Sequence, residues 1–347
     1  MSRARAWREV LPVMAIPGAL LLVALAVLSS AGADLRTTLS ALWFGSLGSP
    51  YALLSATLVR ATPLILLGLS VTLAFRAGVL NIGAEGQFIA GASAGGAVAL
   101  ATAPVLPGYL SLLLALCAGI FAGGVWAAVA AELKRRFGVL EVISTLMLNF
   151  VALYGVSYLV HGPLQEPTRA YPQSATLPLA VRLPFVIDGQ RLHLGFIFAV
   201  LLGLALWYIF ARTAAGFRIR ITGAGAAAAA SAGAVDTARV SFLAFIASGA
   251  IAGAAGAVEV TGVTYTLFER ISPGYGYSAI AVALLARLHP TAVIGAGIFF
   301  GALEAGASAM QRDAGVPSQF AAIIEALVIL GVLAIDRLQA RRRGMTL

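Results

Sequence analysis

Charged residues are scarce in this sequence: they account for 11% of its 347 residues, whereas hydrophobic residues account for 60%. An ordinary soluble domain carries about 25% charged residues, because its surface has to be solvated by water. This chain lacks the polar surface that soluble domains of its length would need. Its apolar residues form runs of about 20, the length that a helix needs to cross the hydrocarbon core. The composition therefore indicates an all-α integral membrane protein.

Residues that could catalyse a reaction or bind a metal are scarce as well. The only lysine is Lys134, so no phosphate-binding loop of the Gly-x-x-x-x-Gly-Lys type is present and the chain does not itself hydrolyse ATP. The three histidines are scattered, and no His-Glu-x-x-His or Cys/His cluster is present to hold a metal. The single cysteine, Cys117, cannot form an intrachain disulfide, and we expect it to be a buried small residue. We expect no catalytic residue, no metal and no cofactor.

The apolar runs predict about ten membrane spans within a single transmembrane domain covering residues 1–347. The basic residues sort between the loops of this arrangement, with about sixteen of the 23 on one side and six on the other. The positive-inside rule places the richer side, and both termini, in the cytoplasm. The basic excess is thus a topology signal, and we find no basic-aromatic patch typical of nucleic-acid binding. The predicted spans are 11–30, 52–75, 86–103, 109–131, 142–161, 193–211, 241–261, 278–289, 291–311 and 318–336.

The N-terminus also imitates a signal peptide, because basic residues, an apolar stretch and Ala31-Gly32-Ala33 follow one another. The apolar stretch is about 18 residues long, which is longer than a usual signal core and favours a retained first span. The longest outer loop runs from His161 to His193 and is rich in proline, and the longest inner loop is 212–240. External and cytoplasmic partners would dock at these two loops.

Six ionisable side chains fall within or close to the predicted spans, where each costs a few kcal/mol and is a functional hypothesis by default. Glu141 follows a basic cluster and is expected at the membrane interface. Glu259 lies near the outer end of its span, as either a structural or a functional group. Arg60 could reach outward or pair with a carboxylate. Glu304 and Glu325 lie nearest mid-span, as structural partners or as cavity-lining groups; the sixth residue is Glu85.

Two glycine-rich stretches, residues 76–87 and 269–277, each follow a span and open a new apolar helix. Irregular backbone at membrane depth is tolerated only where protein or a water-filled cavity satisfies its polar groups. The two stretches are predicted to sit on opposite sides of the bilayer, as broken helices in the halves of an inverted repeat would. Such paired breaks point to a transporter binding site, although chance similarity of the two stretches is the alternative.

Three separated motifs in this region resemble a known family. The stretch FRAGVLNIGAEGQF (75–88) resembles ABC permeases for branched-chain amino acids, simple sugars and nucleosides. The stretches EVISTLMLN (141–149) and SPGYGYSAIAVALL (272–285) resemble the nucleoside and simple-sugar branch. The resemblance runs from about residue 50 to residue 335. It implies the membrane permease subunit of an ATP-driven importer in the bacterial cytoplasmic (inner) membrane.

The resemblance also implies partners. They are a cytoplasmic ABC ATPase, a second permease subunit that is often a different polypeptide, an external solute-binding lipoprotein and the surrounding membrane lipid. The implied substrates are nucleosides, with simple sugars next. The alternatives from other classes are a secondary transporter that uses Glu304 or Glu325 as a proton site, and a membrane-embedded enzyme, which the absence of catalytic motifs disfavours.

The inner loop resembles the cytoplasmic coupling segment of the family, which would rest in a groove of the ATPase. The family usually has Asn-Pro shortly after the last glycine of GFRIRITG (216–223), whereas this chain has Gly225-Ala226. This difference leaves the individual ATPase contacts open, and an alanine-rich stretch is also simply a good helix former. The candidate coupling residues are Gly216, Arg218, Arg220, Gly223 and Gly233.

The candidate substrate-pathway residues carry groups that suit a nucleoside. Amides and carboxylates can bind ribose hydroxyls and the polar edge of a base, and tyrosine rings can stack on a base. The alternative is that these groups cap helices and satisfy freed backbone without touching solute. The candidates are Asn81, Glu85, Gln87, Asn149, Tyr275, Tyr277 and Glu304.

Overall fold

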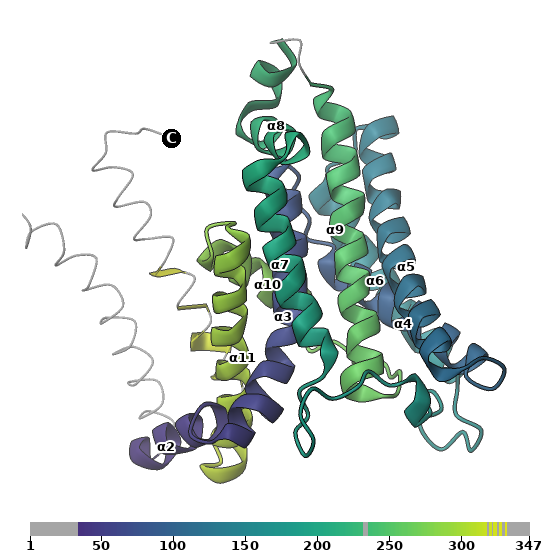
Figure 1. Ribbon diagram of the computed structural model, residues 1–347, viewed down its shortest axis with the longest axis vertical. Coiled ribbons are helices and arrows are strands. Elements are labelled where there is room, and N and C mark those ends of the chain that lie inside the picture. The colour runs from purple at the N-terminus through teal and green to yellow at the C-terminus, as the bar shows by residue number, and fades with distance from the viewer. Residues whose placement is uncertain are drawn as a thin grey trace, which may run out of the picture. The chain divides into compact units, whose positions relative to one another are not determined.

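The computed structural model describes residues 34–231 and 235–317, together with the short stretches 319–320, 322–324, 326–327 and 330–331. These residues form helices and no sheet, with three isolated β-bridges in the loops. The all-helical expectation is therefore confirmed for the described chain (Figure 1). The predicted first span, most of the last one, Glu325, Gly233 and the residues at both termini lie outside the described residues.

The chain divides into two compact units, residues 58–299 and the two ends of the chain, 1–57 with 300–347. In the first unit the helices are α3 (Leu58–Arg76), α4 (Ala84–Thr102), α5 (Gly108–Phe137), α6 (Glu141–His161), α7 (Leu194–Arg212), α8 (Ala214–Ser231), α9 (Thr237–Glu259) with a π-helical turn η3 (Val260–Thr264), α10 (Tyr275–Leu285) and the start of α11 (Pro290–Asp313). A short 3-10 turn, η2 (Leu179–Val181), lies in the long loop before α7.

The second unit contains α2 (Leu35–Ser46), a π-helical turn η1 (Ala52–Thr57) and the remainder of α11. Asp34 caps the start of α2, because its carboxylate accepts hydrogen bonds from the backbone N–H groups of Arg36 and Thr37. Ala41, Met310 and Val316 form a small apolar core in this unit. The sequence did not predict α2, which falls in a stretch expected to be a loop.

Six helical stretches of the described chain are long and apolar enough to cross a membrane. Each coincides with a predicted span to within a few residues, so the multi-pass character is confirmed. The six stretches are Ala52–Arg76, Gly108–Phe137, Glu141–His161, Leu194–Arg212, Thr237–Thr264 and Pro290–Asp313. The predicted spans at 86–103 and 278–289 correspond to α4 and to the short α10, which are not among the six.

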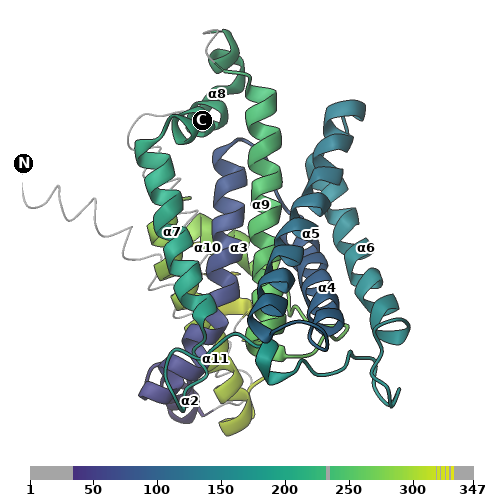
Figure 2. The same ribbon diagram turned by 45° about the vertical axis from the view of Figure 1, so that its right-hand side comes forward.

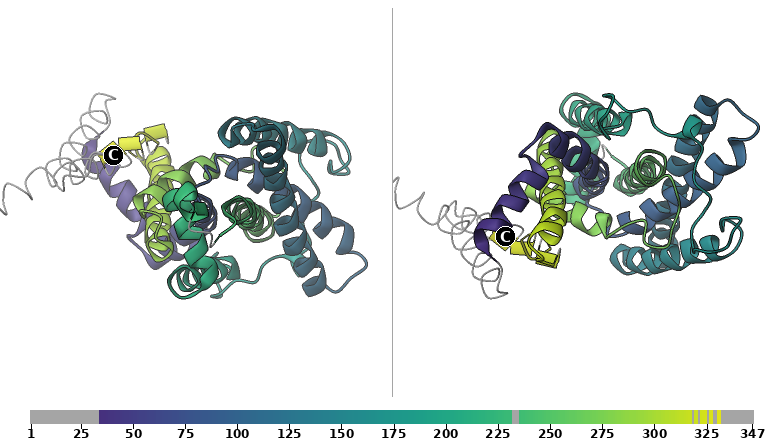
Figure 3. Two further views of the ribbon diagram at one scale, coloured as in Figure 1. Left: turned by 90° about the horizontal axis from the view of Figure 1, so that it is seen from above. Right: turned by 90° about the horizontal axis from the view of Figure 1, so that it is seen from below.

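Helix α9 lies between α3 on one side and α4 and α5 on the other (Figure 3). Ser70 of α3 bonds to Ser248 of α9, and the Ser241 hydroxyl donates to the Ala77 carbonyl just past α3, so these two helices are antiparallel. Every residue of α3 from Ala61 to Ala74 is buried. Helix α3 is thus an interior helix of its unit, and α5 and α6 have outward apolar faces.

Glycines allow α4, α5 and α9 to approach each other closely. A Cβ atom added at Gly253 would lie closer to the Gly119 carbonyl oxygen than real Cβ atoms approach, and one at Gly91 would overlap the Gly253 backbone. Small residues serve this purpose in membranes, where helices associate mainly by van der Waals packing because lipid is as apolar as a side chain. Cys117 lies on the outer surface of α5 and is exposed, so the expectation that it is buried is wrong. Cys117 and Gly119 are two residues apart in the helix, so their side chains point to different faces of α5.

The outer loop between α6 and α7 packs against the chain that follows α9. The backbone N–H groups of Ser174 and Leu177 donate to the carbonyls of Leu267 and Tyr265 over 2.8 Å each. The guanidinium of Arg182 lies 4.3 Å from the centre of the Tyr265 ring. This proline-rich loop therefore has a defined structure that covers one end of the unit.

His193 closes this loop at the start of α7. Its Nδ1 accepts a hydrogen bond of 3.2 Å from the backbone N–H of Gly195, and its buried Nε2 has no hydrogen-bond partner in the described part of the chain. Gly195 and Gly262 pack directly against the imidazole ring. Burial, and secondarily the positive charge of Arg191, lower the pKa of His193 from 6.5 to about 4.

We expect Gly253→Ala to lower the midpoint of thermal unfolding in detergent, because the added methyl group forces α9 away from α5. Overpacking of this kind costs about 1–3 kcal/mol. Gly155→Ala is the matched control, since nothing lies within 4 Å of a Cβ at that position. Equal melting temperatures for the two variants would show that the close approach of α5 and α9 is not required.

We expect acid to destabilise the fold through His193. The unfolded chain takes up a proton below pH 6.5 and the folded chain only below about pH 4, so stability falls as the pH is lowered through this window, by up to about 3 kcal/mol. His193→Asn keeps a good helix N-cap and removes the titrating group. The variant should lose less stability than the unsubstituted protein between pH 6.5 and pH 4, measured by thermal unfolding; identical pH profiles would contradict this.

Candidate functional site

The two broken stretches meet inside the first unit. The first leaves the end of α3, turns back through residues 77–83 and opens α4, and the second leaves η3 and opens α10. The Gly276 N–H at the start of α10 donates to the Glu85 carboxylate at the start of α4 over 2.7 Å. A Cβ at Gly276 would overlap the backbone of Ala84 and Glu85, so only glycine allows this approach. The two helix N-termini therefore lie side by side.

The stretches reach this point from opposite ends of the unit. Helices α3 and α9 are antiparallel, and the first stretch follows α3 whereas the second follows α9. Residues 265–268, directly before the second stretch, bond to the outer loop. The chain just after α10 returns to the end of α3, where Arg76 Nε donates to the Leu288 carbonyl over 2.6 Å. The two stretches thus enter from opposite ends of the unit but meet at Glu85 and Gly276, so the expectation that they sit on opposite sides of the bilayer is wrong.

Asn81 organises the first break. It is fully buried, and its Nδ2 donates to the Gln87 Oε1 over 2.9 Å and to the Ser248 Oγ over 2.8 Å. Its Oδ1 accepts from Gln87 Nε2 and from the Gly83 N–H, each over 3.0 Å. The two amides therefore pair reciprocally, and they tie the re-entrant backbone to α9 through Ser248. These bonds saturate the amide of Asn81.

Asn149 of α6 holds the start of α4 from the other side. Its Oδ1 accepts from the Gly86 N–H over 2.8 Å, and its Nδ2 donates to the Ile82 carbonyl over 3.0 Å and to the Tyr277 hydroxyl over 3.2 Å. One amide thus satisfies backbone groups on both sides of the break. The free N–H groups of a helix N-terminus need such partners, because no water is available in the hydrocarbon core.

The two tyrosines of the second break differ. Tyr275 is buried, and its ring meets Phe88 edge-on with 6.0 Å between ring centres. Tyr277 is 45% exposed, and its hydroxyl accepts from Asn149. Only the Tyr277 ring has the exposed face that stacking on a solute needs.

The predicted pathway residues therefore fall into three groups. Asn81 and Gln87 form a closed pair, and Glu85, Asn149 and the two tyrosines surround the junction of α4 and α10. Glu304 belongs to the other unit, where it is partly buried and its carbonyl accepts from the Ser308 hydroxyl. The geometry shows a structural role for the first two groups, and solute contact stays a prediction.

Sequence reasoning missed three polar partners of this site. Ser70 and Ser248 link α3 to α9, and Ser272 caps the turn before α10 by accepting from the N–H groups of Gly274 and Tyr275. Serines in apolar helices are common and carry no pattern that marks them. The signal that could have found Ser272 is its place directly before Pro273-Gly274, where a helix start needs a cap.

The predicted coupling segment forms α8, which lies across the ends of α7 and α9 (Figure 2). Gly216 and Gly223 pack against backbone: a Cβ would overlap the Ile209 carbonyl at the first and the Arg76 carbonyl at the second. Arg218 is exposed, whereas Arg220 donates to the Phe210 carbonyl. The helix is interrupted at Gly225, where the backbone is extended. Gly223 and Arg220 thus anchor α8 to the transmembrane helices.

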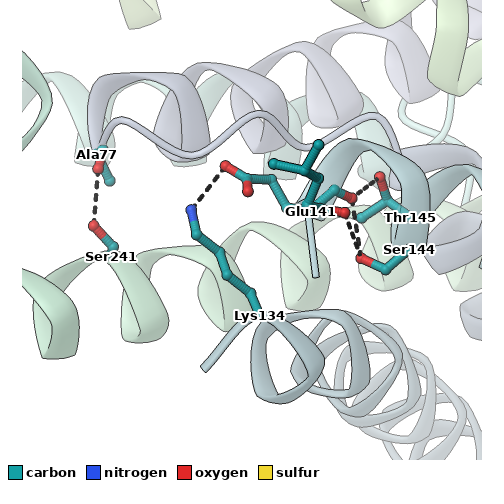
Figure 4. Close-up of polar contacts among 7 residues, drawn as sticks. Ala77, Lys134, Glu141, Ser144, Thr145 and Ser241 are labelled. Atoms are coloured by element: carbon teal, nitrogen blue, oxygen red, sulfur yellow. Dashed lines mark hydrogen bonds and ion pairs between the residues drawn. The ribbon is translucent and has the colours of Figure 1, made fainter. Parts of the chain in front are cut away.

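Lys134 of α5 pairs with Glu141 of α6 over 2.9 Å, near the point where Ser241 bonds to Ala77 (Figure 4). This ion pair is what the interfacial interpretation of Glu141 expects, and the position of Glu141 relative to the membrane stays a prediction. Glu259 is buried at the other end of α9, where the positive charges of Arg60 and Arg191 act on it. The structural and the functional interpretation of Glu259 both stay predictions.

We expect Glu85→Ala to destabilise the protein, because it leaves the buried Gly276 N–H without an acceptor, at a cost of about 1–3 kcal/mol. Glu85→Gln retains a carbonyl oxygen that can accept the same bond and serves as the matched control. Thermal unfolding should show a clear drop for the alanine variant and a smaller one for the glutamine variant. Equal drops would mean that the charge of Glu85, and not its hydrogen bond, matters.

Residues 53–333 match the family described as "Branched-chain amino acid transport system / permease component". Among similar proteins, the guanosine ABC transporter permease protein NupP of Bacillus subtilis is 38% identical over 92% of each chain. The glucose ABC transporter permease protein TsgB13 of Haloferax volcanii is 37% identical over 84% of this chain and 79% of its own length. The nucleoside ABC transporter permease protein NupB of Lactococcus lactis is 29% identical over 83% of this chain and 80% of its own length.

No solved structure matches the chain significantly. The family match covers far more than half of the sequence, and it includes both breaks, the junction of α4 and α10, and the α8 segment. This chain therefore belongs to the permease-component family of ABC transport systems and is a membrane subunit of a transporter, not an enzyme.

Proposed function

We propose that this chain imports nucleosides across the cytoplasmic membrane as half of the membrane portion of an ATP-driven importer, with simple sugars as the second substrate class. The observation that carries the proposal is the 38% identity to a guanosine permease over 92% of both chains. A permease named for glucose is nearly as similar, at 37%, which is why sugars remain the second class.

A second, different permease subunit completes the membrane portion in this proposal. Two guanosine permeases of Bacillus subtilis, NupP and NupQ, are both similar to this chain, at 38% and 29% identity. Two Haloferax volcanii proteins, TsgB13 and TsgC13, form a similar set. Two related but distinct permeases in one organism support a heterodimer. A cytoplasmic ATPase and an external solute-binding lipoprotein complete the importer.

The ATPase docks on α8 in this proposal. A cavity of about 930 Å³ lies beside α8, between the end of α5 and the start of α9. It is lined by both charged and apolar side chains, among them Lys134, Asp236, Arg239 and Phe242. Arg76, Lys134, Arg220 and Arg239 all lie at this end of the unit. The positive-inside rule makes this end cytoplasmic, and we place both chain termini on the same side.

The full chain crosses the membrane about ten times in this proposal, with α3–α4 and α9–α10 as corresponding parts of an inverted repeat. The antiparallel course of α3 and α9, and the meeting of the two breaks, support this arrangement. Helix breaks near the membrane midplane are where transporters of this kind bind solute.

Solute passes the exposed face of Tyr277, beside Asn149 and Glu85, while Asn81, Gln87 and Tyr275 hold the surrounding backbone. Glu304, which belongs to the other unit, stays a predicted pathway residue. The binding protein supplies most of the selectivity, so the permease holds solute weakly. ATP binding moves α8, and the membrane helices alternate between outward and inward access.

The whole complex in membrane vesicles tests the proposal. We expect nucleoside uptake to require ATP and the binding protein, to stop with vanadate, and to persist with a protonophore while ATP is maintained. Uptake that is lost with the protonophore alone would favour an ion-gradient-driven transporter. Competition by guanosine and by glucose then separates the substrate classes: uptake of labelled guanosine should be blocked by unlabelled guanosine and not by glucose.

A further inference from the structure

Arg76 occupies a position that its place in the sequence motif does not explain. It is the last residue of α3 and contacts two other helices. Its Nε donates to the carbonyl of Leu288, which lies shortly after the end of α10, and its guanidinium lies 4.9 Å from the centre of the Phe210 ring near the end of α7. The directed N–H and the planar cation are both properties of arginine that lysine does not share.

Helix α10 is short and is flanked by irregular backbone at both ends. It has 11 residues, which is too few to cross the hydrocarbon core. Gly274 precedes it with φ of 103°, and Arg287 and Leu288 follow it with φ of 49° and 56°. Left-handed backbone costs a residue other than glycine roughly 1–2 kcal/mol. Two such residues in a row persist because their surroundings hold them, and the bond from Arg76 to the Leu288 carbonyl is part of those surroundings.

Helix α8 contacts the same arginine. Gly223 packs against the Arg76 backbone so closely that a Cβ would overlap the Arg76 carbonyl. Arg220 donates to the carbonyl of Phe210, the residue whose ring lies against the Arg76 guanidinium. The charges of Arg220 and Arg76 repel each other. A displacement of α8 therefore changes the packing, the ring contact and the repulsion at Arg76 together.

The other end of α10 is the junction described above, where the Gly276 N–H bonds to Glu85 and Tyr277 bonds to Asn149. Direct contacts thus run from α8 through Arg76 and Leu288 to α10, and through α10 to the start of α4. Every step is a hydrogen bond, a ring contact or a backbone contact between described residues of one unit.

We propose that Arg76 is a positioning residue that transmits the movement of α8 to α10, so that α10 shifts against α4 at the Glu85–Gly276 junction during transport. The inference rests on the proposed function, because it needs an ATPase that moves α8. It adds to the proposed function the helix that moves, α10, and the side chain that links α10 to α8, Arg76. Arg76 touches neither solute nor nucleotide.

Hydrogen–deuterium exchange on the whole complex, with and without a non-hydrolysable ATP analogue, tests the inference. In the unsubstituted complex we expect the analogue to change exchange in α8 and also in residues 275–289. A response in α8 without one in residues 275–289 would overturn the inference and leave the proposed function intact. No response in α8 and no ATP-dependent uptake would overturn the proposed function itself.

Arg76→Lys and Arg76→Ala separate coupling from charge and from folding. We expect both to retain binding-protein-stimulated ATP hydrolysis and the exchange response of α8, while uptake falls about tenfold, a usual size for coupling between sites. The response of residues 275–289 should be lost. Lysine keeps the positive charge at this end, so normal membrane topology is retained in that variant.

Arg212→Ala is the matched control, because it removes an exposed positive charge at the end of the neighbouring α7. It should keep both the exchange response of residues 275–289 and the ratio of uptake to ATP hydrolysis. Normal uptake and a normal α10 response in both Arg76 variants would overturn the inference, as would equal uncoupling in Arg212→Ala.

Discussion

The need to satisfy buried peptide groups where two helices are interrupted determines much of this structure. Each unsatisfied N–H or C=O in hydrocarbon costs several kcal/mol, so the breaks before α4 and α10 exist only because side chains bond to them. Asn149 serves one break from α6, and Glu85 links it to the other. The amide pair of Asn81 and Gln87 holds the turn within the first break. The positions of α4, α6, α9 and α10 follow from these few bonds.

The sequence predicted the six long spans of the described chain, because the length and apolarity of a membrane helix are set by the bilayer and can be read locally. It also located both breaks, since Gly78, Gly83, Gly274 and Gly276 lie in them. It could not predict that Glu85 bonds to a residue 191 positions away, because no periodicity relates the two. The π-helical turns η1 and η3 have no composition of their own, and α2 is a short helix whose polar residues resemble a loop.

The sequence predicted which residues belong to the candidate site, but it did not predict the role of each residue. Polar side chains at membrane depth mark a special place, but the same amide can cap a helix or bind a solute. The structure shows how Asn81 differs from Tyr277: the amide of Asn81 is saturated by protein, whereas the Tyr277 ring is 45% exposed. That difference depends on burial, which residue type does not encode. The burial of Cys117 was predicted wrongly for the same reason, because its apolar neighbours do not show which face of α5 it occupies.

The glycine contacts among α4, α5 and α9 join backbone directly to backbone. Contacts made by backbone and by alanine methyl groups contain no polar side chain that could distinguish one solute from another. Proteins that share these contacts can change cargo by altering residues elsewhere while the frame is inherited intact.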